Sequence, residues 1–226
     1  MVQLEICANG LNSALVAQQG GAYRVELCDN LLEGGTTPSY GQIALSRKLL
    51  HIKLYPIIRP RGGDFVYSDQ ELEIMKADIL SCKSLGCDGV VFGILLPDGS
   101  IDVDRCRALL ELAHPMPATF HRAFDAAADL FKSREQLSAL GFERILTSGG
   151  AVTAIDGAAV IRKLIEAAAE RIEIMPGAGV KVENVADLVK ATGAKVVHGS
   201  LSTTIAYPLT DLESVSQVVN TLSAIE

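Results

Sequence analysis

A regular alternation of short apolar runs and longer amphipathic stretches constrains the fold of this 226-residue sequence more than any other feature. The apolar runs predict strands over Gln3–Ala8, Tyr23–Asp29, Lys53–Pro60, Gly89–Leu95, Ala118–Phe124, Arg144–Thr147, Arg171–Met175 and Lys195–Gly199. The amphipathic stretches predict helices that begin near Leu11, Ser39, Asp69, Asp102, Ala128, Asp156, Val182 and Leu212. The strand–helix unit thus recurs about eight times, at about 28 residues each, close to the minimum for a strand, a helix and two loops.

Eight consecutive βα units predict an α/β protein, a (β/α)8 TIM barrel that forms a single domain over residues 1–226. Glycines mark the expected helix ends at Gly20-Gly21, Gly86, Gly141 and Gly193. The main rival is a doubly wound sheet that binds a dinucleotide, which requires G-x-G-x-x-G after an early strand. The nearest match, Gly177-Ala178-Gly179, lacks the third glycine and comes late in the chain. The Walker A, H-E-x-x-H and G-x-S-x-G motifs are absent as well.

The charge balance argues against two classes of partner. The chain has 20 Lys and Arg against 27 Asp and Glu, a formal net charge of −7, which is the wrong sign for nucleic acid or an anionic membrane surface. The segment from Met1 to Gly20 carries no basic start, and no window approaches the ~20 apolar residues of a membrane span. We therefore expect a cytoplasmic protein that binds neither nucleic acid nor membrane, with its five cysteines as reduced thiols.

A short repeat links the first two predicted strands. Leu4–Asn9 reads Leu-Glu-Ile-Cys-Ala-Asn, and Val25–Asn30 repeats it as Val-Glu-Leu-Cys-Asp-Asn, 21 residues later. If the two strands are neighbours, equivalent positions lie about 4.8 Å apart, near enough for Cys7 and Cys28 to share one ion. Two soft thiolates favour Cu(I), whereas tetrahedral zinc needs two further ligands. The alternative is inert packing of both thiols, which we also expect for Cys82, Cys87 and Cys106.

Charged and imidazole side chains on several predicted strands form a second candidate site. The C-terminal strand ends of a barrel converge on one mouth, where active sites form. The residues expected there are Glu5, Glu26, Arg59, Arg61, His121 and His198. In an enzyme that acts on a small anionic, or phosphorylated, substrate, a glutamate would be the general base, His121 an acid or base, and the two arginines would clamp the anion. The alternative is a structural ion-pair network that fixes strand register.

Small residues after the last two predicted strands predict an anion site. Barrels often hold phosphate where the loops after these strands present glycines and free N–H groups. The residues at these positions are Gly177, Gly179, Gly199 and Ser200. The glycines of Arg59–Phe65 could likewise let the backbone approach a ligand or hinge a lid. Ordinary turns also use glycine, so a purely structural role is the alternative.

Several segments together resemble the CutC copper homeostasis family. They are Glu5–Cys7, Gly21–Cys28, Glu33–Ser39, Pro56–Phe65, Thr119–Asp125, Leu146–Gly149 and Gly177–Val180. One departure is Gly34–Ser39, which reads Gly-Gly-Thr-Thr-Pro-Ser where the family pattern more often has Gly-Gly-Leu-Thr-Pro-Ser. The resemblance implies a cytosolic (β/α)8 barrel, a homodimer and a role in copper homeostasis. It also implies that Cys7 and Cys28 are the Cu(I) ligands.

Two functional hypotheses of different class remain open. In the first, the protein handles copper and holds Cu(I) between Cys7 and Cys28. In the second, it is a barrel enzyme of unknown reaction whose mouth binds a small anionic ligand. A purely structural or regulatory barrel would leave the clustered charges without a role.

Overall fold

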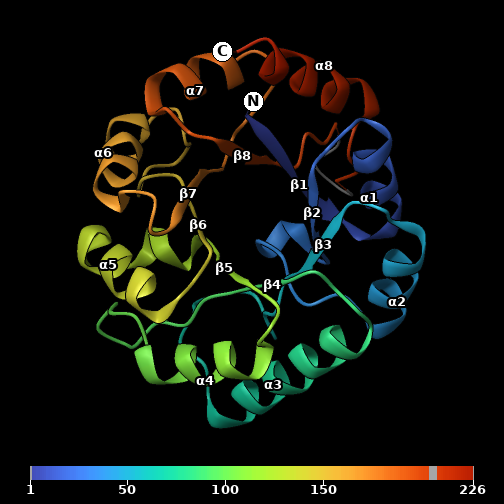
Figure 1. Cartoon of the computed structure of the whole chain (residues 1–226). Helices are drawn as coiled ribbons and strands as arrows, with labels where there is room; N and C mark the ends of the chain where they lie inside the picture. The colour runs from blue at the N-terminus through green and yellow to red at the C-terminus, as the bar shows by residue number, and fades with distance from the viewer. Residues whose placement is uncertain (1, 204–207, 226) are drawn as a thin grey trace.

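The computed structural model describes residues 2–203 and 208–225, in which eight strands are enclosed by eight α-helices in a (β/α)8 barrel (Figure 1). The strands are β1 Gln3–Asn9, β2 Arg24–Cys28, β3 Lys53–Pro56, β4 Val90–Phe92, β5 Ala118–Phe120, β6 Arg144–Thr147, β7 Glu173–Pro176 and β8 Val196–Gly199. The helices are α1 Gly10–Gln19, α2 Tyr40–Leu49, α3 Asp69–Ser84, α4 Val103–Ala113, α5 Leu130–Leu140, α6 Ala158–Ala168, α7 Val185–Thr192 and α8 Leu212–Ser223. Within these described ranges, no helix has the length and apolar character to cross a bilayer.

The barrel consists of two four-stranded parallel sheets that meet at two seams. One sheet has the order β3-β2-β1-β8 and the other β4-β5-β6-β7. A parallel bridge between Ile57 and Val91 joins β3 to β4, and another between Gly177 and His198 joins β7 to β8. Every strand therefore has a neighbour on both sides, and the predicted fold class is confirmed.

The predicted helix starts lie within three residues of those in the structure, and several of the helices are capped by side chains as expected. Ser39 and Asp102 accept hydrogen bonds from the backbone N–H groups of Gln42 and Arg105 at the starts of α2 and α4. At the other end of a unit, Gly141 terminates α5 with a φ of 92°, a left-handed conformation that favours glycine.

The predicted fifth strand, Ala118–Phe124, is too long. β5 ends at Phe120, and a 3-10 helix, η2, follows over Arg122–Ala126. The cause is local: the ring Nδ1 of His121 accepts a hydrogen bond from the backbone N–H of Ala123 at 3.2 Å and caps this turn. The chain therefore bends out of the sheet at His121.

The two faces of the strands differ in polarity. On β1 and β2 the alternate residues Leu4, Ile6, Val25 and Leu27 belong to the large apolar core, which also contains the buried residues of the helices. The residues between them, Glu5, Cys7, Arg24, Glu26 and Cys28, lie on the opposite face, because side chains alternate along a strand. This segregation leaves charged groups and thiols inside the barrel.

Candidate functional site

Two cysteine thiols lie in contact between the first two strands. The Sγ atoms of Cys7 on β1 and Cys28 on β2 are 3.5 Å apart. Cys28 is buried and Cys7 is half-buried. The register differs from the one that the sequence repeat suggests, since Cys7 lies opposite Glu26 and Cys28 lies opposite Asn9. The side chains bridge this offset, so the predicted proximity of the two thiols holds although their backbone positions are not equivalent.

A buried carboxylate and an imidazole adjoin the thiols. His198 on β8 lies with its Nε2 atom 2.7 Å from Glu26 Oε2 and 3.7 Å from Glu5 Oε1. One ligand atom from each of Cys7, Glu26 and His198 lies within 4.8 Å of the others. The structure therefore places Glu26 and His198 beside Cys7 as a compact set of sulfur, oxygen and nitrogen donors. Cys28 adjoins this set through its contact with Cys7.

The protonation states of this set follow from burial and close contacts. Burial raises the pKa of the Cys28 thiol well above its usual value, and the neighbouring Cys7, Glu26 and Glu5 raise it further. Burial lowers the pKa of His198, but its contacts with Cys7 and Glu26 outweigh that effect and hold the pKa well above the usual value. Without a ligand, Cys28 is therefore a thiol and His198 an imidazolium paired with Glu26. A metal ion bound here would displace protons.

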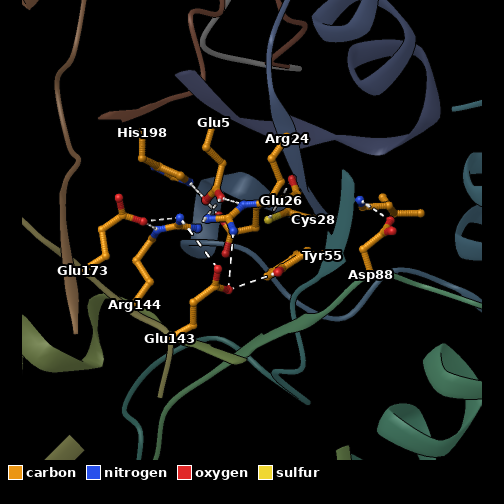
Figure 2. A network of polar contacts seen from close by, with 11 residues as sticks. Glu5, Arg24, Glu26, Cys28, Tyr55, Asp88, Glu143, Arg144, Glu173 and His198 are labelled. Atoms are coloured by element: carbon orange, nitrogen blue, oxygen red, sulfur yellow. Dashed lines mark hydrogen bonds and ion pairs between the residues drawn. The ribbon is translucent and has the colours of Figure 1, made fainter. Parts of the chain in front are cut away.

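A network of buried and half-buried ion pairs adjoins these groups on the inner face of the barrel (Figure 2). Glu5 pairs with Arg24, and Arg144 on β6 lies 4.0 Å from the same carboxylate while it pairs with Glu173 on β7. Arg24 also lies over the ring of Tyr55, 4.3 Å from its centroid. Glu5 therefore lies between the network and His198. The structural ion-pair interpretation describes Glu5 better than a mouth-exposed general base does.

Most of this network was not among the predicted site residues. Arg144, Glu173 and Glu143 stand at or next to the starts of their strands, away from the carboxyl ends where the active site of a barrel is expected. The sequence signal that could have identified these residues was a charged residue within or next to an otherwise apolar strand segment, because a buried charge requires a partner.

A cavity of about 960 Å³ opens beside the thiols and brings together side chains from several strand ends. Of the six charged or imidazole residues predicted for the mouth, the cavity is lined by Glu26, Arg59, His121 and His198. Of the predicted anion-site residues, Gly179, Gly199 and Ser200 line it. Cys7 also lines the cavity, as do Arg122 and Lys181.

Four predicted residues lie outside the cavity wall, among them the buried Cys28. Glu5 is 1 % exposed and belongs to the ion-pair network described above. Arg61 pairs with Asp64 and Glu71 on the outside of the loop after β3. Gly177 packs where a Cβ would collide with Leu146 and approach His198, so its missing side chain makes room for its neighbours.

The two arginines that were predicted as a clamp therefore have different environments. Arg59 is 4 % exposed, and its guanidinium donates hydrogen bonds to the carbonyls of Glu33, Gly35 and Gly63 at 2.8, 3.0 and 2.8 Å. Only Arg59 lines the cavity, so the two guanidinium groups do not meet there.

Comparison with known proteins places the chain in a family. Residues 2–203 match the model of the CutC family. The chain is 54 % identical over 197 residues to the family protein CutC of Chromobacterium violaceum, covering 87 % of this chain and 80 % of that one. It is 47 % identical over 201 residues to the copper homeostasis protein cutC homolog of Homo sapiens, covering 89 % and 74 %.

Solved structures support the family assignment and the fold. The CutC protein of Streptococcus agalactiae superposes with a TM-score of 0.85 and 44 % sequence identity, covering 88 % of this chain and 99 % of that one. Phosphoribosylanthranilate isomerase of Thermotoga maritima superposes with a TM-score of 0.66 at 15 % identity, covering 100 % of both chains, a likeness of fold alone. The family model and these relatives show that the chain belongs to the CutC family.

Proposed function

We propose that this protein acts in copper homeostasis by binding Cu(I) between Cys7 and Cys28. The contact of the two Sγ atoms at 3.5 Å carries this proposal. Relatives at about half identity are named copper homeostasis proteins, among them the homologue of Mus musculus at 48 %. Cys7 lines the large cavity, so an ion has a route to the pair.

The spacing of the sulfurs fits a bent site better than a linear one. At a metal–sulfur distance of about 2.3 Å, two sulfurs 3.5 Å apart subtend an angle of about 100° at a shared ion. An ion with a bent S–metal–S angle has room for a third ligand. The deprotonated Nε2 of His198 or a carboxylate oxygen of Glu26 is within reach of that position.

Zinc is the competing occupant, because thiolate, imidazole and carboxylate all bind zinc and the ligand atoms of Cys7, Glu26 and His198 lie within 4.8 Å of one another. A zinc site on these donors requires that His198, whose pKa is raised, lose its proton, and Cu(I) between the cysteines requires that Cys28, whose pKa is also raised, lose its own. Proton release therefore opposes both ions, and the softness of the donors separates them. Cu(I) requires only the two soft sulfurs, which it prefers to nitrogen and oxygen donors.

The test is an anaerobic titration with Cu(I) against a chromophoric chelator. Wild type should bind one ion per chain. Cys7→Ser and Cys28→Ser should each weaken binding by more than ~100-fold, since changes to outer-shell partners alone cost 10- to 100-fold. Cys106→Ala is the matched control, because it removes a buried thiol outside the cluster.

Two outcomes would contradict the proposal. One is Cu(I) affinity that is unchanged in both serine variants. The other is zinc that binds wild type more tightly than Cu(I) does at neutral pH, which would assign the same donors to a different metal.

A further inference from the structure

Arg59 is a buried cation without a carboxylate partner. Its three hydrogen bonds go to backbone carbonyls, and its Nε has no partner. Among the described residues, no carboxylate oxygen comes within 4.0 Å of its guanidinium. A charge that is only 4 % exposed is costly unless it is paired. The environment of Arg59 therefore lacks an anion.

His121 supplies a second donor without a partner on the same side of the cavity. Burial, together with the positive charge of Arg59, lowers the pKa of His121 to about 3, so the ring is neutral at physiological pH. Its Nδ1 accepts the hydrogen bond of Ala123, which places the ring proton on Nε2. That Nε2–H group is buried and has no partner among the described residues.

Phe65 connects the two residues into one wall. The guanidinium of Arg59 lies 4.8 Å from the centroid of the Phe65 ring, and the rings of Phe65 and His121 lie 5.1 Å apart. All three residues line the 960 Å³ cavity, which is within the range that holds small organic molecules. Ile57 and Leu146 add apolar surface to the lining.

We propose that this wall binds the oxyanion of a small organic molecule, a carboxylate or a phosphate ester. Arg59 supplies the positive charge, and the Nε2–H of His121 donates a hydrogen bond to an oxygen of the ligand. The apolar body of the ligand packs against Phe65. The assignment is independent of the cysteine pair, since none of its residues belongs to the cluster of Cys7, Glu26 and His198.

The features of this wall favour an organic oxyanion over a metal ion. A guanidinium repels a cation, and a histidine whose Nδ1 already accepts a hydrogen bond has no free lone pair to offer one. An inorganic ion alone would leave the aromatic surface of Phe65 unused. An oxyanion on an apolar body uses the charge, the ring donor and the aromatic surface together.

Calorimetric titration of the metal-free protein at neutral pH tests the assignment with three probes. Benzoate and phenyl phosphate represent the two oxyanions, and benzamide is their neutral analogue. We expect one molecule of benzoate or phenyl phosphate to bind per chain. The probe with the higher affinity shows whether the site prefers a carboxylate or a phosphate ester. Benzamide should bind at least about tenfold more weakly, because hydrogen bonds to a charged group contribute about 1.5–3 kcal/mol.

Substitutions of His121 and Arg59 test whether the oxyanion binds at this wall. His121→Phe removes the ring donor but keeps an aromatic ring beside Phe65, and Arg59→Lys keeps the charge but loses the planar fork. Each should weaken the oxyanion by about tenfold or more. Arg61→Lys, in the same loop but outside the cavity lining, should leave binding unchanged. Urea unfolding curves show which variants fold.

The assignment is overturned if neither oxyanion binds wild type at millimolar concentration, or if benzamide binds equally well. It is also overturned if a folded His121→Phe or Arg59→Lys protein binds as wild type does. Because no metal is present in the titration, a failure of the copper proposal would leave these outcomes unaffected.

Discussion

Replacing Arg24 with methionine is expected to lower the free energy of unfolding by about 3–5 kcal/mol. Arg24 and Glu5 form an ion pair in which each side chain is only 1 % exposed. Without the guanidinium, the Glu5 carboxylate stays buried, and its nearest remaining cations are Arg144 Nη1 at 4.0 Å and His198 at 3.7 Å. Removing Arg24 takes away the closest partner of a buried carboxylate and leaves it only these longer contacts, which accounts for the size of the effect.

Urea unfolding followed by circular dichroism measures this loss, with two controls. Arg171→Met removes one partner of an exposed pair with Glu135, in which the side chains are 50 % and 52 % exposed, and should cost no more than ~1 kcal/mol. The double variant Glu5→Leu and Arg24→Met removes both charges and should regain much of the loss, because apolar replacements of a buried pair are often tolerated. Equal losses for Arg24→Met and Arg171→Met would contradict the interpretation.

The fold could be predicted from the sequence because its signals are local. Each βα unit carries its own apolar run, amphipathic helix and caps, such as Ser39 and Asp102, so the number and order of the units follow without tertiary information. The end of β5 could not be predicted in this way. A side chain, His121, interrupts the strand there by bonding to the backbone of Ala123, and neither composition nor periodicity signals that bond.

The site was predictable in part. The cysteine pair follows from strand adjacency, but the donors beside it depend on register, which sets Cys7 opposite Glu26 and Glu5 opposite His198. A two-residue difference in register is invisible in the sequence, because it leaves every side chain on the same face. The positions of the two arginines in the loop after β3 could not be predicted from the sequence either. The conformation of this loop, which follows no strand periodicity, places Arg59 in the cavity wall and Arg61 outside it.

Acid should destabilise the protein through His121. The pKa of this buried imidazole is lowered to about 3 in the folded state, against an ordinary value of 6.5. Between these two values the unfolded chain binds a proton at His121 and the folded protein does not. The free energy of unfolding should therefore be unaffected by this group above pH 6.5 and should fall by about 1.4 kcal/mol per pH unit below it, about 5 kcal/mol in all.

Comparing urea unfolding of wild type with that of His121→Phe, from pH 6.5 downward, isolates this contribution. The carboxylates of the protein titrate in both proteins, so the difference between the two curves reports His121 alone, and it should grow by about 1.4 kcal/mol per pH unit. His51→Asn, which removes an exposed histidine, should follow wild type. Parallel curves for wild type and His121→Phe would mean that His121 accepts a proton in the folded barrel. The ring would then be a cation beside Arg59, and its Nδ1 could no longer accept the hydrogen bond of Ala123.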